Sequence, residues 1–176
     1  FAYVIPGNTT GNLPFAFKLD KGVDLNRMRE ACYQVLDAHP GLKGIIKPTE
    51  QKYYALFRDD TRRIEIPITQ VRDEEIPEMM QKLIVPFIYR ENDNLVHIYL
   101  FEGQKNNYIF FDVAHIMGDG VTMNILMEDL NKAYAGEPLE AETYTAYEYA
   151  LEEQLRKDNG ILEHDTKYVT NLMDGI

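Results

Sequence analysis

The segment FFDVAHIMGDGVTM, residues 110–123, places a histidine, an aspartate and a glycine at a spacing that could do chemistry: His115, Asp119 and Gly120. A neutral imidazole can accept a proton near pH 7, as a general base must. A carboxylate between a strand and a helix can fix the loop, and a glycine lets the backbone come close to a ligand. The amides that open the following helix could help to stabilise an oxyanion. The segment therefore indicates a candidate site for general-base chemistry.

The strand before the turn is expected to present His115 at the end of an apolar row. Side chains alternate along a strand, so the histidine shares one face with Ile109, Phe111 and Val113. Partial desolvation at that position would keep the pKa of the imidazole low and the ring neutral. This environment would suit a proton acceptor.

The same residues also fit plain structural roles. Asp119 could simply be the N-cap of a helix that starts at Thr122, and Gly120 could simply satisfy a turn. His115 could be a strand-end histidine whose hydrogen bonds are satisfied within the fold. Residue spacing alone leaves both interpretations open.

Hydrophobic periodicity predicts which elements position this segment. Strands are predicted at residues 12–19, 62–71, 94–101 and 106–115, with a hairpin formed by residues 44–47 and 51–58. Helices are predicted at residues 23–43, 74–84, 122–134, 145–157 and 165–173. The order mixes hairpins with crossing helices, which favours an α+β sandwich: a mostly antiparallel sheet with helices packed on it.

Particular residues sharpen these boundaries. Asp24 is a plausible N-cap of the first helix, and Pro40 with Gly41 should stop it. Pro67 favours an edge position for its strand. Gly136 sits where a glycine commonly ends a helix.

Composition and charge exclude several classes of protein. The chain has 176 residues, enough for a proper core, and 45% of them are hydrophobic. With 29 acidic and 18 basic residues, its net charge of −11 disfavours nucleic acid and anionic membranes as partners. There is no apolar run long enough for a transmembrane helix. The opening residues do not read as a secretory signal. Because the chain begins at Phe1, we expect a fragment or a processed form.

The remaining ionisable candidates receive structural interpretations. Cys32 is expected to be a small buried hydrophobe, since one cysteine cannot form an internal disulfide. His39 is expected to cap the end of the first helix, His97 to be a structural or surface residue of a strand, and His164 to be solvated. No histidine and carboxylate spacing suggests a metal site, so no metal is predicted. Cysteine usage fits a reducing cytoplasm.

The segment AHIMGDG resembles the HHxxxDG signature of the condensation domains of nonribosomal peptide synthetases, members of the chloramphenicol-acetyltransferase-like superfamily. Further stretches are similar to the family in the right order: LNRMREACYQVLDAHPGLKG, VPFIYRENDNLVHIYLF, DGVTMNILMEDLNKAYAGEPL and KYVTNLMDGI. The resemblance implies that residues 1–176 are the amino-terminal lobe of such a domain, an α/β sandwich of the chloramphenicol-acetyltransferase type. The second lobe is absent, so the isolated lobe is expected to be inactive.

The resemblance also implies roles for individual residues. His115 and Gly120 would be catalytic, the histidine as proton acceptor or as the group that orients the amine, and the glycine through backbone room or an amide. Asp119 would hold the loop. Lys43 stands at the family's arginine position, where it could pair with Asp119 without bidentate geometry. Ala114 replaces the first histidine of the signature, at a position that faces away from His115.

The function implied is peptide-bond (amide) formation between a donor acyl or peptidyl thioester and an acceptor aminoacyl thioester, in peptide antibiotic and other secondary metabolite biosynthesis. No cofactor would bind directly, because both substrates arrive on phosphopantetheine arms of carrier proteins. The partners would be these carriers and the second lobe.

Two other functions stay open at this stage: a free-standing acyltransferase that uses acyl-coenzyme A, and a non-catalytic docking relative. Docking relatives usually lose the second histidine or the glycine, and both are present here. The amino acids joined, the donor stereochemistry, the module context and the oligomeric state are not encoded in any recognisable pattern.

Overall fold

The computed structural model describes residues 7–48, 54–57, 59, 61–87 and 93–174. The chain forms two compact units, Phe1–Ala141 and Glu142–Ile176. The first unit contains the strands and the candidate residues, and the second contains the last two helices.

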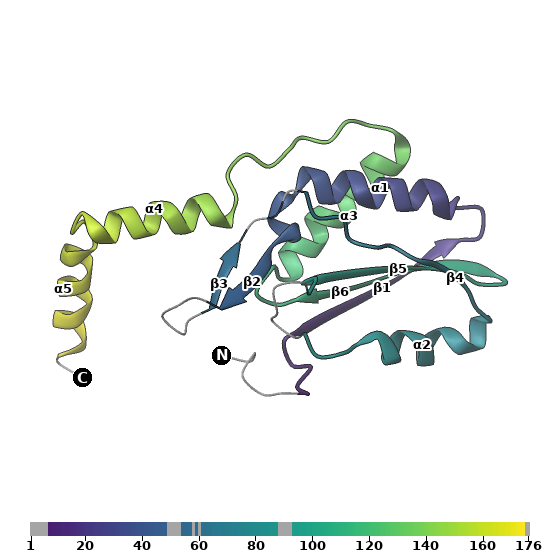
Figure 1. Cartoon of the computed structure of the whole chain (residues 1–176), viewed down its shortest axis with the longest axis horizontal. Helices are drawn as coiled ribbons and strands as arrows, with labels where there is room; N and C mark the ends of the chain where they lie inside the picture. The colour runs from purple at the N-terminus through teal and green to yellow at the C-terminus, as the bar shows by residue number, and fades with distance from the viewer. Residues whose placement is uncertain (1–6, 49–53, 58, 60, 88–92, 175–176) are drawn as a thin grey trace. The chain divides into compact units, whose positions relative to one another are not determined.

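A four-stranded sheet forms the centre of the first unit, in the order β1-β6-β5-β4 (Figure 1). Its strands are β1 (Asn12–Asp20), β6 (Asn106–Ala114), β5 (Val96–Glu102) and β4 (Ile68–Gln70). The first three pair antiparallel, whereas β4 runs parallel to β5 at the edge that Pro67 predicted. The prediction of a mostly antiparallel sheet is confirmed.

The predicted hairpin forms a second, two-stranded sheet. Its strands β2 (Ile45–Pro48) and β3 (Tyr54–Phe57) pair antiparallel. The turn that joins them lies outside the described residues.

Helix α1 (Leu25–Ala38) begins and ends where the sequence signals predict. The Asp24 carboxylate accepts hydrogen bonds from the amides of Asn26 and Arg27, at 2.8 and 3.2 Å, so Asp24 is its N-cap. The α-helix stops before Pro40, and Pro40–Lys43 forms a short 3₁₀ helix. The predicted stop at Pro40 and Gly41 is confirmed, since proline cannot supply the amide that would continue the α-helix, and the rest of the 23–43 stretch continues only as the 3₁₀ turn.

Figure 1 shows α1 and α3 (Gly120–Ala135) on one face of the four-stranded sheet and α2 (Ile76–Leu83) on the other. Gly136 ends α3 in the left-handed conformation, with a φ of 86°, as predicted for a terminal glycine. The sheet is therefore covered on both sides, which explains why the β6 sequence is apolar without a polar alternation.

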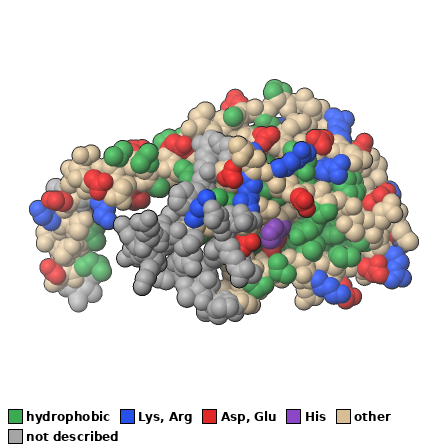
Figure 2. Space-filling view, viewed as in Figure 1, with side chains coloured by type: hydrophobic (Ala, Val, Ile, Leu, Met, Phe, Trp, Pro, Cys, Tyr) green, Lys and Arg blue, Asp and Glu red, His purple; other side chains and the backbone are tan. Residues whose placement is uncertain are grey.

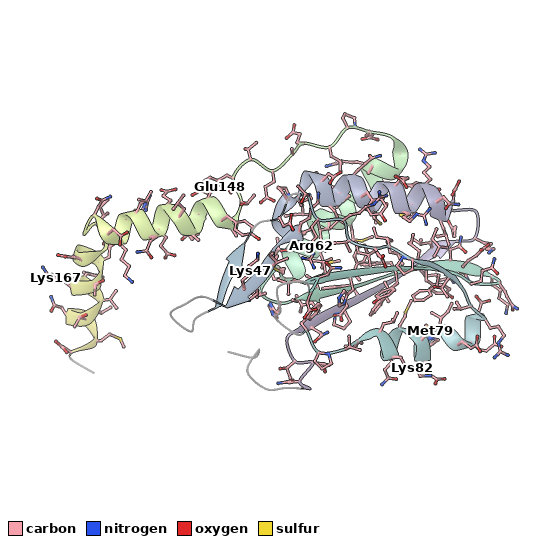
Figure 3. All side chains as sticks on the ribbon, viewed as in Figure 1. Lys47, Arg62, Met79, Lys82, Glu148 and Lys167 are labelled. Carbon is pink, nitrogen blue, oxygen red and sulfur yellow. The ribbon has the colours of Figure 1, made fainter. Side chains whose placement is uncertain are left out.

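Helix α2 packs less deeply than its sequence suggests. Ile76 is 3% exposed, whereas the residues predicted to face inward, Met79, Met80 and Leu83, are only half-buried. Figure 3 shows Met79 on the sheet side of the helix and Lys82 pointing away from the sheet.

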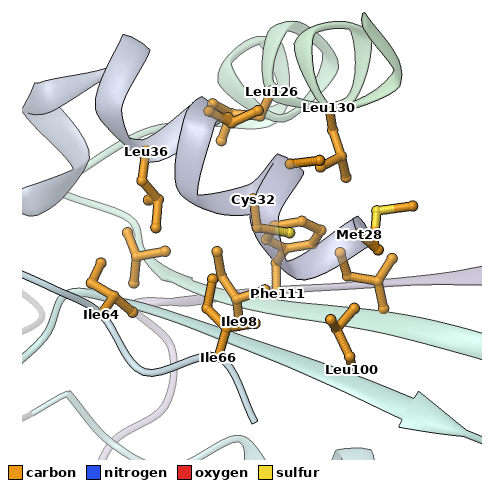
Figure 4. Packing of buried hydrophobic residues seen from close by; sticks show 14 of the residues in the cluster. Met28, Cys32, Leu36, Ile64, Ile66, Ile98, Leu100, Phe111, Leu126 and Leu130 are labelled. Carbon is orange, nitrogen blue, oxygen red and sulfur yellow. The ribbon is translucent and has the colours of Figure 1, made fainter. Parts of the chain in front are cut away.

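The main core lies between the sheet and the pair α1 and α3 (Figure 4). Apolar side chains of all three elements meet there, among them Met28, Cys32, Leu36, Ile98, Leu100, Phe111, Leu126 and Leu130. Burial raises the pKa of the Cys32 thiol to about 12. Cys32 is the buried, unreactive hydrophobe that the sequence predicts.

The second unit consists of α4 (Ala146–Asp158) and α5 (Leu162–Met173). Helix α4 opens with a capping box between Thr145 and Glu148. Figure 2 shows hydrophobic side chains at the surface of these helices, and Leu151, Leu155 and others are more than half exposed. Among the described residues, no helix is long and apolar enough to cross a membrane.

Candidate functional site

The end of β6 is held by backbone hydrogen bonds to both neighbouring segments. The Ala114 amide donates to the carbonyl of Leu95, next to β5, at 2.8 Å. The His115 amide donates in the opposite direction to the carbonyl of Gly11, also at 2.8 Å. The chain then turns, and the Met117 amide donates back to the Ala114 carbonyl at 2.7 Å. His115 therefore occupies a fixed backbone position between a central strand and a helix.

The side chain of His115 is exposed. The predicted apolar row of Ile109, Phe111 and Val113 is buried in the core, with exposures of 0 to 5%. The strand ends at Ala114, however, and the turn carries His115 out of the row. The expectation that the His115 imidazole is partly desolvated is therefore wrong. The burial of the strand does not continue into the turn that holds this residue.

Asp119 is the N-cap of α3. Its Oδ1 accepts hydrogen bonds from the Thr122 amide at 2.9 Å and the Thr122 hydroxyl at 3.1 Å, and the Asp119 amide donates to that hydroxyl at 3.1 Å. These bonds from Thr122 hold the pKa of Asp119 below its ordinary value, with smaller contributions from the Val121 amide and the charge of His115. The helix starts at Gly120, two residues before the predicted Thr122, because Thr122 completes a capping box.

Two glycines in the loop have different surroundings. A β-carbon at Gly118 would lie 2.8 Å from Thr122 Cγ2 and 2.9 Å from its hydroxyl oxygen. A β-carbon at Gly120 would meet no atom within 4 Å. Any side chain at position 118 would therefore have to displace Thr122, a constraint that the sequence did not reveal, while nothing in the described lobe disfavours a side chain at position 120.

Lys43 does not pair with Asp119, contrary to the sequence prediction. Lys43 is 8% exposed, and its ammonium donates to the carboxylate of Asp37, six residues earlier and near the end of α1. None of the groups that lower the pKa of Asp119 is Lys43. The 3₁₀ helix after Pro40 keeps Lys43 beside the end of α1, which favours the local partner.

A different pair of ionisable side chains joins the end of α1 to α3. His39 is the C-cap of α1, as predicted, and its Nε2 lies 2.9 Å from Oδ2 of Asp129 on α3. Both side chains are 15% exposed. The Asp129 carboxylate also accepts a hydrogen bond from Lys132 at 3.0 Å.

Asp112 is a buried acid that the sequence analysis did not single out. It is 0% exposed, and its Oδ2 accepts a hydrogen bond from Nδ2 of Asn12 at 2.7 Å. Burial raises the pKa of Asp112 to about 6, against the opposing effect of the Asn12 bond. The available signal was an aspartate inside the apolar run FFDVA, which has no role in an ordinary strand core.

Exposed apolar side chains border the loop. Ile116 is 50% exposed, and Val121 and Ile125, one turn apart on α3, are 65% and 48% exposed. The position of the family's first histidine is different: Ala114 is fully buried beside Ile46 and Leu95. The exposed imidazole and its apolar border form a surface suited to an acyl group and its reacting amine, whereas the amides of Thr122 and Met123 at the start of α3 are already bonded to Asp119.

The chain that carries this loop matches a known protein family. The model of the family described as "Condensation domain" matches residues 2–175. The chain belongs to the condensation-domain family. This family is of the acyltransferase type, and the resemblance read from the sequence is confirmed.

Curated relatives of this condensation-domain chain are much longer. Surfactin synthase subunit 1 of Bacillus subtilis (strain 168) is 23% identical over 168 residues, 95% of this chain and 5% of that protein. Nonribosomal peptide synthetase ataP of Aspergillus terreus (strain NIH 2624 / FGSC A1156) is 29% identical over 133 residues, 75% of this chain and 8% of that protein.

Solved structures confirm the lobe fold. The epimerization domain from the third module of tyrocidine synthetase B matches with a TM-score of 0.78 and 21% identity, over 94% of this chain and 40% of that chain. The condensation domain of the Monacolin K polyketide synthase MokA matches with a TM-score of 0.76 and 17% identity, over 93% and 38%. At these identities the likeness shows the fold alone. The condensation-domain chain spans about two fifths of each solved chain.

Within the described residues, no group of three or more His, Cys, Asp or Glu side chains is placed to hold a metal ion.

Proposed function

We propose that the chain is the amino-terminal lobe of a condensation domain that forms an amide bond between two carrier-bound thioesters. The observation that carries the proposal is the fixed backbone position and exposed ring of His115, in a chain matched by the condensation-domain family over residues 2–175. The share of the solved chains that it covers, about two fifths, supports a second lobe as the other wall of the site.

In the proposed reaction, the acceptor amine attacks the carbonyl carbon of the donor thioester and a C–N bond forms. A free α-amine has a pKa near 8, so about a tenth of it is neutral at pH 7. The tetrahedral intermediate then carries a positive nitrogen and a negative oxygen. His115 either takes the proton from that nitrogen or orients the amine. The C–S bond breaks as the carbonyl re-forms, and the proton passes to the leaving thiolate.

The residues around His115 support this chemistry without entering it directly. Asp119 holds the start of α3 through Thr122, which is the loop-holding role proposed for it. Gly120 leaves open space beside the helix start, where an acyl carbonyl could approach the backbone. Ala114 packs into the core, so its side chain is not on the His115 surface.

The proposed partners follow from the relatives. Surfactin synthase subunit 1, bacitracin synthase 3 and the hybrid PKS-NRPS synthetase poxE are the kinds of protein to which the chain is similar. We propose that both substrates reach the lobe on phosphopantetheine arms of carrier proteins in the cytoplasm. The lobe itself would bind no cofactor, and alone it would be inactive.

The test uses the protein extended through its second lobe, with donor- and acceptor-loaded carrier proteins. The condensed thioester is detected by intact-protein mass. His115→Ala should lower the rate by up to about 10²–10⁴-fold while positioning of the tethered substrates leaves residual product. The melting temperature should stay unchanged, because the ring is exposed.

His39→Ala is the matched control. It removes a histidine that pairs with Asp129 between two helices, so it should lower the melting temperature and leave the rate per folded molecule unchanged. Transfer only from acyl-coenzyme A would replace the proposal with a free-standing acyltransferase. No transfer from the wild-type protein would leave a docking function.

A further inference from the structure

A polar cluster lies on the face of the sheet opposite α1 and α3, among apolar neighbours. It consists of Asn12 at the start of β1, His97 on β5 and Asp112 on β6. Asp112 is 0% and Asn12 8% exposed, and His97 stands directly opposite Asp112 in the strand register. The ring of Phe87 stacks on His97 with 5.0 Å between centroids. Three polar side chains are therefore gathered in an apolar layer of the sheet.

The hydrogen bonds of this cluster are incomplete. Nδ2 of Asn12 donates to Asp112 Oδ2 at 2.7 Å and to the Val85 carbonyl at 2.8 Å. In the described part of the chain, Oδ1 of Asp112, Oδ1 of Asn12 and Nδ1 of His97 are buried without a partner. The two oxygens can only accept a hydrogen bond while Asp112 is ionised, and Nδ1 of His97 accepts or donates according to the tautomer of the ring. A protonated Asp112 carboxyl would add a further donor to this cluster.

The charged and titratable groups around Asp112 also favour its neutral form. On β5, burial lowers the pKa of His97, opposed by the charge of Asp93, so the imidazole tends to stay uncharged. Burial raises the pKa of Tyr99, and the charge of Asp112 adds to that effect. Burial is the main cause of the raised pKa of Asp112, and the opposing effect comes from Asn12 on β1. No cation in the described residues contributes to it.

The cluster lies next to the backbone that holds His115. Asn12 follows Gly11, whose carbonyl accepts the His115 amide at 2.8 Å. Asp112 lies on β6 three residues before His115, and β6 ends at Ala114, directly before the turn. The Asn12–Asp112 bond therefore fastens the start of β1 to the end of β6 at the point where the His115 turn begins.

We propose that Asp112 and Asn12 form a positioning pair for His115, which holds the turn tightly when Asp112 is protonated and loosens it when Asp112 is ionised. Ionisation would strengthen the Asn12 bond itself, but the burial of the charge opposes ionisation more strongly. The ionised carboxylate, buried without a cation, would draw water and weaken its contacts with the neighbouring strands. The positioning role rests on the proposed function of His115, whereas the coupling between Asp112 and the turn does not.

The experiment measures amide hydrogen exchange by NMR on this chain, as protection factors corrected for intrinsic exchange, from about pH 5 to about pH 8. The His115 amide bonds to Gly11, before β1, and the Ala114 amide bonds to Leu95, before β5. The ratio of their protection factors therefore shows whether the turn opens on the β1 side more readily than on the β5 side. In the wild type, protection of His115 should fall several-fold relative to Ala114 as the pH rises. Asp112→Asn should abolish that fall, and the swap Asn12→Asp with Asp112→Asn should restore it.

The matched control is Asn107→Asp, at the other end of β6. Asn107 is 3% exposed and donates to the carbonyls of Lys21 and Val23, so a buried acid there should lower stability yet leave the wild-type pH dependence at His115. The proposal would be overturned if the ratio of His115 to Ala114 protection in the wild type did not change with pH. That measurement does not depend on whether any variant folds. The proposal would also be overturned if Asn107→Asp abolished the pH dependence at His115 as Asp112→Asn does.

The activity measurement is separate. In the protein extended through its second lobe, the acceptor amine gives wild type and variant the same underlying pH dependence. The condensation rate of Asp112→Asn relative to that of the wild type should therefore rise between about pH 5 and about pH 8, as the wild-type turn loosens. If the exchange ratio responds and the wild-type protein forms no condensed product, the proposed function fails and the coupling stands. If product forms and the ratio is flat, the coupling fails and the function stands.

Discussion

Gly118 lies so close to Thr122 that a β-carbon on the glycine would sit 2.8 Å from Thr122 Cγ2. Thr122 is also the partner of Asp119 in the capping box that opens α3. One threonine thus fixes both the close turn before the helix and the first turn of the helix. The loop after His115 is consequently held by packing and capping, and Gly120 is left facing open space.

The two loop glycines should respond oppositely to alanine. Gly118→Ala should lower the melting temperature, because Thr122 would have to move and the capping box would be disturbed. Gly120→Ala should leave the melting temperature unchanged or raise it slightly, because alanine is the better helix former. Its condensation rate should still fall if the open space receives substrate. Differential scanning fluorimetry and the carrier assay measure both effects, and a fully active Gly120→Ala would contradict the role given to that glycine.

Asp119→Ala should impair folding at least as much as activity. The substitution removes an N-cap, so the melting temperature should drop by a few degrees at neutral pH. The pKa of Asp119 is lowered in the folded protein, so its stabilising effect is present above the ordinary pKa of 3.8 and is lost as the pH falls through the folded value. Thermal melts of both proteins should converge in acid. A variant that melts like wild type at neutral pH and is inactive would rule out the structural role.

Most of the fold could be predicted because its signals are local. Asp24, Pro40 and Gly136 mark helix ends through the conformations that their own backbones and side chains allow. The pairing of β5 with β6 follows from two strong strands joined by a short turn. Pro67 likewise places β4 at an edge.

The features that the sequence did not reveal depend on tertiary contacts. His115 is exposed because the strand ends one residue before it, and alternation gives no signal of where a strand ends. Lys43 prefers Asp37 because a 3₁₀ helix sets its direction. The pairing of Asp112 with Asn12 joins residues a hundred positions apart, which no local pattern encodes.

The ion pair of Lys43 can be tested by double-mutant cycles. Lys43→Met combined with Asp37→Asn should show a coupling free energy of up to about 1 kcal/mol, since the aspartate is largely exposed and its attraction is screened by solvent. The cycle with Asp119→Asn should show no coupling beyond experimental error. Urea denaturation supplies the free energies of unfolding. A larger coupling with Asp119 would restore the pairing that the sequence suggested.

Asp112→Asn should make the protein more stable at neutral pH and change how its stability depends on pH. The pKa of Asp112 is raised from 3.8 to about 6 on folding, so the unfolded chain ionises first and the folded protein resists ionisation. Well below the unfolded pKa of 3.8 both states are protonated and the buried carboxyl carries no penalty of charge burial. Between about pH 4 and about pH 6 the free energy of unfolding of the wild type should fall relative to the variant, by up to about 3 kcal/mol, and then level off. Urea denaturation of both proteins across this range measures the difference. A constant difference would mean that Asp112 ionises equally easily in the folded and unfolded chain, and that burial imposes no penalty on its charge.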